Sequence, residues 1–131
     1  MTDRSTERFP DALLARLAEV RTIEIETIGR RSRRTRRATT WVVVDGERPI
    51  VRSEFGDRGQ WYRNALADPR VALVVDGRVH PATATRLTDP AAIGRASALL
   101  REKYARSSAL PVMVDPAVEP MTLALEPRPE G

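Results

Sequence analysis

The stretch that decides the fold is residues 22–44, which read TIEIETIGRRSRRTRRATTWVVV. Residues 22–28 alternate apolar and polar side chains, and residues 38–44 are β-branched and aromatic, so both runs are typical of strands. Residues 29–37, between them, hold six arginines, a glycine and a serine, with no acid. A tight basic loop gathers guanidinium groups, a hydroxyl and backbone N–H groups, which suits a phosphate or polycarboxylate ligand. A solvated surface loop is the alternative interpretation of the same run.

The composition of the 131 residues indicates a single domain. Hydrophobic residues make up 41% of the chain, enough for one core, and we expect disorder only at residues 1–8 and 127–131. Cysteine is absent, which excludes thiolate chemistry and suits a reducing compartment. The chain has no apolar run near the roughly 20 residues of a membrane helix and begins without a signal-peptide core. We therefore expect a cytoplasmic protein with no membrane partner.

Local patterns predict three helices and about six strands. Helical spacing and end signals mark helices over residues 11–20, 60–67 and 88–107. Alternating or β-branched runs mark strands over residues 22–28, 38–44, 49–53, 71–75, 79–87 and 121–125. The pairs Asp45-Gly46 and Asp76-Gly77 signal hairpin turns. Hairpins with few long connections favour a mainly β, α+β fold, a small antiparallel barrel with helices outside it.

The chain is poor in catalytic side chains of its own. Its one histidine, His80, precedes Pro81 on a predicted strand, so we interpret it as a polar strand residue, not part of a Ser–His–acid unit. No cluster of histidine, cysteine and carboxylate residues has metal-ligand spacing, so we expect no metal. No Walker or Rossmann glycine motif is present. A bound cofactor would have to carry any redox chemistry.

Nucleic-acid binding is an alternative raised by the net charge of +4. The six arginines in residues 30–37 are enough to contact a phosphate backbone. However, no aromatic residue interrupts the run, and basic and acidic residues are interspersed elsewhere. We therefore expect no nucleic-acid partner.

Residues 27–32 (TIGRRS), Arg36 and residues 61–71 (WYRNALADPRV) together resemble the split-barrel flavin and deazaflavin oxidoreductases. The likeness is strongest to uncharacterised, DUF-type relatives of the deazaflavin-dependent nitroreductases, and it covers roughly residues 22–87. It implies a six-stranded antiparallel split β-barrel of the FMN-binding type with a cofactor groove on its outside. It also implies the deazaflavin coenzyme F-420 as the cofactor, with FMN as the alternative.

The resemblance assigns roles to particular residues. The implied cofactor-binding residues are Arg31, Ser32 and Arg36 at the phosphate, Trp41 in the groove, Ser53 and Gly56 near the ring, and Trp61 beside it. In the family a glycine follows the serine, and a proline precedes the second anchoring arginine. This chain has Arg33 and Thr35 at those positions. Because glycine permits a positive φ, Arg33 implies either backbone strain or a reshaped loop.

The activity implied by the resemblance is hydride transfer from the reduced cofactor to an electron-poor small molecule, such as a quinone, an enone or a nitro compound. Tyr62 and Tyr104 are candidates to donate a proton or position the substrate, with core packing as the alternative for each. A split-barrel protein that binds a ligand or flavin without turnover is the alternative function. The superfamily contains both dimers and monomers, so a homodimer is one of two open states.

Overall fold

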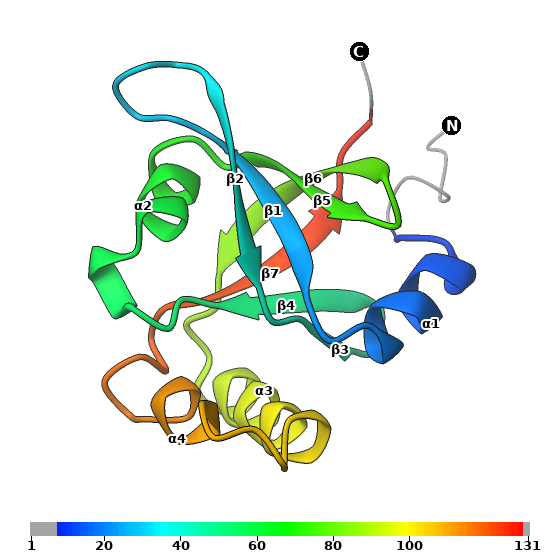
Figure 1. Ribbon diagram of the computed structural model, residues 1–131, viewed down its shortest axis with the longest axis vertical. Coiled ribbons are helices and arrows are strands. Elements are labelled where there is room, and N and C mark those ends of the chain that lie inside the picture. The colour runs from blue at the N-terminus through cyan, green and yellow to red at the C-terminus, as the bar shows by residue number, and fades with distance from the viewer. Residues whose placement is uncertain (1–7, 130–131) are drawn as a thin grey trace.

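The computed structural model describes residues 8–129, which form a curled antiparallel sheet with helices packed around it (Figure 1). The elements are α1 (Asp11–Glu19), β1 (Ile23–Ile28), β2 (Thr35–Thr40), β3 (Val43–Asp45), β4 (Arg48–Arg52), the 3-10 turn η2 (Gly56–Arg58), α2 (Gln60–Ala67), β5 (Arg70–Val75), β6 (Arg78–Arg86), α3 (Pro90–Lys103), α4 (Leu110–Met113) and β7 (Thr122–Pro127). The strand order is β2-β1-β5-β6-β7-β4-β3, and every neighbouring pair is antiparallel. This confirms the predicted mainly β, split-barrel fold. In the described part of the chain, no helix is long and apolar enough to span a bilayer.

The predicted number of six strands is wrong, because the run 38–44 forms parts of two strands and residues 8–129 contain seven. The chain leaves β2 at Thr40 and enters β3 at Val43, and these strands lie at opposite ends of the strand order. Val42, in the link, bonds to side chains instead of a neighbouring strand. Its N–H donates to the Tyr104 hydroxyl at 3.2 Å, and its carbonyl accepts from the Lys103 ammonium at 2.6 Å. The bend therefore joins the two edges of the curled sheet.

Strand β1 has the predicted alternation of faces. Ile23, Ile25 and Thr27 are buried, whereas Glu24 is exposed and Glu26 is half-buried. The buried face packs into a cluster inside the curled sheet with Leu17 from α1, Tyr62 from α2 and residues of β4, β5 and β7. A second cluster lies between α3 and strands β3 and β4 and includes Ile50, Leu100, Tyr104 and Met113. Burial of apolar area in these two clusters holds the helices against the sheet.

The predicted hairpin turns are confirmed. Asp76 and Gly77 have φ values of 52° and 75°, the pair of positive angles that defines a type I′ turn between β5 and β6. Gly46, with φ of 66°, opens the turn between β3 and β4. The predicted helices over residues 11–20 and 60–67 are α1 and α2.

Two predicted boundaries near the C-terminus are wrong. Helix α3 ends at Lys103 instead of continuing to residue 107, because Tyr104 has a φ of −110° and directs its hydroxyl to the β2–β3 link. The predicted disorder from residue 127 does not hold for Pro127 and Arg128. Pro127 pairs with Ala82, and the Arg128 guanidinium donates to backbone carbonyls of β5 and β6. Residues 1–7 and 130–131, also predicted to be disordered, lie outside the described residues.

The one lysine of the chain, Lys103, is half-buried where α1, α3 and the β2–β3 link meet. Its ammonium donates to the carbonyls of Leu17 and Val42 at 2.9 and 2.6 Å, and no carboxylate within residues 8–129 pairs with it. Burial lowers the pKa of Lys103 to about 8. In the unfolded chain its pKa returns to about 10.4. Between these values the unfolded chain binds more protons, so the free energy of unfolding should rise with pH.

The titration of Lys103 can be read directly, since lysine-selective isotope labelling gives one side-chain signal. We expect its NMR chemical shift to change with a midpoint near pH 8 in the folded protein. A midpoint near the ordinary value of about 10.4 would show that the ammonium is solvated.

Candidate anion-binding groove

An open groove of about 650 Å³ lies between the β1–β2 hairpin and helix α2, which are adjacent in Figure 1. Among residues 8–129, five arginines line it, from both sides, and no acidic residue does. The lining residues are Thr27, Gly29, Arg30, Arg31, Ser32, Arg36, Arg37, Ala38, Gln60, Trp61, Arg63 and Asn64. Concentrated positive charge without a resident acid gives the groove an affinity for anions.

Asn64 joins helix α2 to the hairpin at the groove wall. Its amide nitrogen donates to the Thr27 hydroxyl at 3.2 Å. Its Oδ1 accepts from the Arg30 guanidinium at 2.8 Å and from the Arg30 backbone N–H at 3.3 Å. The Arg30 guanidinium also donates to Gln60 Oε1 at 3.0 Å. Arg30 is therefore held by the protein and fixes the start of the loop against α2.

The remaining groove arginines differ in whether their guanidinium groups form ion pairs within the protein. Arg37 pairs with Glu26 at 3.0 Å on the outer face of the hairpin. Within residues 8–129, no ion pair engages Arg31, Arg36 or Arg63. In that same part of the chain, the backbone N–H groups of Arg31 and Ser32 have no acceptor. Guanidinium groups and N–H donors are thus left at the loop for an incoming anion.

The loop between β1 and β2 is closed by its own backbone. Gly29 N–H donates to the Arg34 carbonyl at 2.8 Å, and Arg33 N–H donates to the Gly29 carbonyl at 3.0 Å. The Ser32 hydroxyl accepts from Arg34 N–H at 3.2 Å. A Cβ on Gly29 would lie 2.5 Å from the Ser32 hydroxyl oxygen, so glycine is the residue this closure accommodates.

Arg33 has a φ of 61°, in the left-handed region where glycine is usual. The loop therefore has at Arg33 a backbone conformation that glycine would adopt without strain, and the arginine bears the strain. A left-handed non-glycine residue costs about 1–2 kcal/mol.

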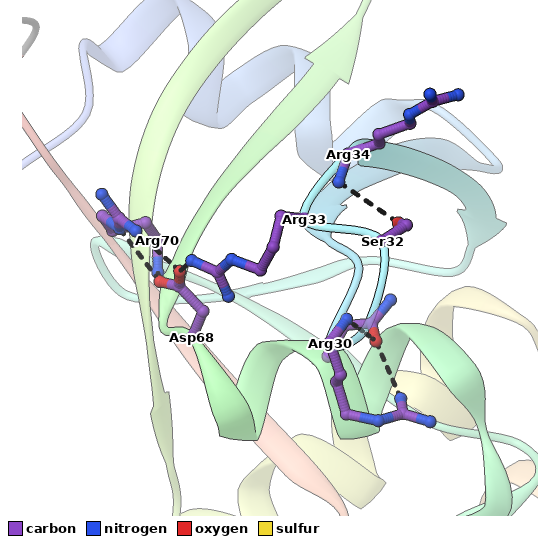
Figure 2. Close-up of polar contacts among 7 residues, drawn as sticks. Arg30, Ser32, Arg33, Arg34, Asp68 and Arg70 are labelled. Atoms are coloured by element: carbon purple, nitrogen blue, oxygen red, sulfur yellow. Dashed lines mark hydrogen bonds and ion pairs between the residues drawn. The ribbon is translucent and has the colours of Figure 1, made fainter.

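Asp68, at the C-terminal end of α2, binds two arginines (Figure 2). Its carboxylate accepts from the Arg70 guanidinium at 2.7 and 3.0 Å and from Arg33 Nη2 at 3.3 Å. The hydrogen bonds from Arg70 hold the pKa of Asp68 well below its usual range, with a smaller contribution from Arg33. Asp68 is therefore ionised throughout the neutral range.

The structure brings together four of the predicted cofactor-binding residues, namely Arg31, Ser32, Arg36 and Trp61, which line one groove. Trp41 does not line it. Its ring stacks on Tyr104, with centroids 3.9 Å apart and planes 6° apart. Ser53 and Gly56 do not line it either, since the Ser53 hydroxyl is fully buried and donates to the Gly56 carbonyl at 2.8 Å.

The two tyrosines predicted as proton donors are core residues. Tyr62 is 2% exposed and meets Trp61 edge to face, and Tyr104 is 1% exposed beneath Trp41. Burial raises the pKa of each phenol. Neither lines the groove, and the Tyr104 hydroxyl donates to the Arg21 carbonyl at 2.7 Å.

The sequence reasoning missed the contribution of α2. Gln60, Arg63 and Asn64 share one helix face because they are spaced i, i+3 and i+4. The sequence carries this signal, because residues 60–64 (QWYRN) place three polar side chains at helical spacing around Trp61, which belongs to the motif. Arg30 and Arg37 lay within the basic run but were not assigned to the site.

The curled antiparallel sheet with helices around it defines a split-barrel-like fold. Its family is shown by residues 13–125, which match the family described as an uncharacterized protein conserved in bacteria, DUF2255. The chain belongs to the DUF2255 family. No curated protein matches the sequence.

Solved structures share the fold at low sequence identity. A conserved hypothetical protein from Mycobacterium tuberculosis is 17% identical, with a TM-score of 0.66, over 100% of this chain and 87% of its own. A reductase that depends on reduced F-420 is 21% identical, with a TM-score of 0.60, over 81% of this chain and 93% of its own. The heme storage protein of Vibrio cholerae is 12% identical, with a TM-score of 0.60, over 92% of this chain and 90% of its own. Another structure, 21% identical with a TM-score of 0.60 over 81% of this chain and 79% of its own, is a domain-swapped dimer.

Proposed function

We propose that this protein binds deazaflavin coenzyme F-420, or alternatively FMN, and passes hydride from it to an electron-poor small molecule. The observation that carries the proposal is the groove beside α2, which five arginines and no acid line in the part of the chain that the structure describes. Both cofactors carry a phosphate group, which matches guanidinium and backbone N–H donors. The F-420-dependent reductase of the same fold supports the proposal at the level of the fold.

The groove residues have separable roles in this proposal. Arg31, Ser32 and Arg36 would hold the phosphate, since the two guanidinium groups are free of ion pairs within residues 8–129. Trp61 forms an apolar part of the wall and would shield the ring from water. When bound, the deazaflavin or flavin supplies the hydride. The chain contributes binding, orientation and the exclusion of water.

A second candidate function is ligand binding without turnover. The observation that favours it is the groove lining, which among the described residues 8–129 includes no histidine, tyrosine, aspartate or glutamate to deliver a proton. The tyrosines predicted for that task are buried in the core. The heme storage protein of the same fold supports ligand binding as a function of this scaffold.

The first test is a titration of the purified protein with F-420 and, separately, FMN, followed by tryptophan fluorescence. Trp61 lines the groove, whereas Trp41 is stacked on Tyr104, so a response that disappears in Trp61→Phe would locate the ligand. We expect micromolar binding of one cofactor. Binding of neither would overturn the proposal, and tight, salt-sensitive binding of random-sequence DNA would favour a nucleic-acid function instead.

Turnover then separates the two candidates. Oxidation of the bound reduced cofactor by a quinone, enone or nitro compound, faster than without protein, would establish an oxidoreductase. Binding without acceleration across that panel would favour the ligand-binding protein. Light scattering on the same samples would determine whether the protein dimerises.

A further inference from the structure

The loop that forms one wall of the groove is held at two points by α2 and the residue that follows it. On one side, Arg30 binds Gln60 and Asn64 near the start of the helix. On the other side, Arg33 reaches Asp68, the residue at the C-terminal end of the helix. Arg31 and Ser32 lie between these two contacts, and both line the groove. Figure 2 shows Arg33 extending toward Asp68 while Arg34 points away from it.

Asp68 is a rigid acceptor for this second contact. Its side chain is only 9% exposed. Oδ1 accepts from the backbone N–H and Nε of Arg70, and Oδ2 accepts from Nη2 of Arg70 and of Arg33. The carboxylate therefore has a fixed position before the loop contacts it.

Arg33 carries backbone strain, which an interaction of its side chain can offset. The left-handed φ of 61° would be unstrained in glycine. Glycine would also give the loop more conformational freedom in the folded and unfolded states. The contact with Asp68 is the only ion pair of Arg33 within residues 8–129, so it is the interaction that an arginine adds at this position.

We propose that Asp68 is a positioning residue for the anion-binding groove, acting through Arg33 to hold Arg31 and Ser32 in the groove wall. The inference rests on the proposed function in so far as the groove binds an anion, but it does not depend on which cofactor is bound. It goes beyond that function because Asp68 itself does not line the groove.

The sign of the effect distinguishes positioning from charge. Asp68 is negative, so its loss would strengthen the binding of an anion if only the Coulomb interaction mattered. If Asp68 positions the loop, its loss weakens binding despite the added positive charge. Because the Arg33 side chain is 59% exposed, its pair with Asp68 contributes up to about 1 kcal/mol, which corresponds to roughly a fivefold change in affinity.

The experiment compares Asp68→Asn with the unmodified protein by calorimetric titration with inorganic pyrophosphate and by amide hydrogen exchange of residues 29–34. We expect pyrophosphate binding to weaken about two- to fivefold and exchange in the loop to accelerate. Asp76→Asn is the matched control, because it removes the same charge from a pair with Arg16 in a turn outside the groove. It should change neither readout. Tighter binding in Asp68→Asn, or unchanged exchange, would overturn the proposal.

Two single variants of Arg33, Arg33→Gln and Arg33→Lys, leave the Asp68–Arg70 contact in place. Arg33→Gln should accelerate exchange in the loop, and adding Asp68→Asn to it should have no further effect on the loop. Arg33→Lys should restore slow exchange, because the contact uses one nitrogen atom and a lysine can replace it. Additive effects of Arg33→Gln and Asp68→Asn would contradict coupling between the two residues. Failure of the protein to bind pyrophosphate would overturn the positioning role of Asp68, whereas pyrophosphate binding without F-420 or FMN binding would overturn only the proposed function.

Discussion

Replacing Arg31 and Arg36 together with alanine should weaken binding of the cofactor by about 3–6 kcal/mol, while the fold stays intact. Each charge-assisted hydrogen bond contributes about 1.5–3 kcal/mol, and this variant removes one such donor group from the loop and one from β2. Both side chains are exposed, and neither takes part in an ion pair within residues 8–129, so their removal leaves no buried partner unsatisfied. The loss corresponds to roughly 10²–10⁴-fold in affinity.

The measurement is the fluorescence titration with F-420 and FMN, with circular dichroism to confirm the fold. The matched control is Arg78→Ala with Arg106→Ala, which removes the same two charges from exposed positions outside the groove. That control should lose less than tenfold, because only long-range attraction changes. Unchanged affinity in the Arg31, Arg36 variant would eliminate these residues as the phosphate anchor. An equal loss in the control would show that net charge, not the groove, attracts the ligand.

The hairpins and the alternation of β1 could be predicted because their causes are local. Asp76 and Gly77 determine their turn through their own φ values of 52° and 75°. The division of residues 38–44 into β2 and β3 has causes far away in the chain. The groups that bond to Val42 belong to Lys103 and Tyr104, 61 and 62 residues later. A window of β-branched residues therefore predicts one strand where tertiary contacts make two.

The same bend explains why the candidate site was only partly predictable. Arg31 and Ser32 lie in one loop and Arg36 lies at the start of the strand that follows it, so a single motif located all three on the groove. Trp41 was expected in the groove as part of the following strand, but the strand ends at Thr40 and the indole stacks on Tyr104. The spacing of Gln60, Arg63 and Asn64 places them on one face of α2, but no local pattern specifies that this face packs beside the β1–β2 hairpin.

Arg52, on β4, is a buried residue whose loss should strongly reduce stability. It is 2% exposed, and its guanidinium donates to the hydroxyls of Thr122 and Ser97 at 2.8 and 2.9 Å. It also donates to the carbonyls of Met113 and Ile93 at 3.1 and 3.3 Å. Burial lowers the pKa of Arg52, but an arginine remains protonated at neutral pH. One side chain therefore joins β4 to β7, α3 and α4.

Arg52→Ala should lower the free energy of unfolding by about 3–5 kcal/mol, since it opens a cavity and leaves buried acceptors without donors. Urea denaturation measures this difference. Arg95→Ala is the control, because it removes an exposed ion pair between α3 and Asp45 of β3, and such pairs contribute at most about 1 kcal/mol. The Arg52 network uses none of the groove residues, so the folded variant should bind the cofactor as the unmodified protein does. A loss of stability no larger than that of Arg95→Ala would show that water or neighbouring side chains satisfy these acceptors, and that apolar packing of α3 and α4 is enough to hold them to the sheet.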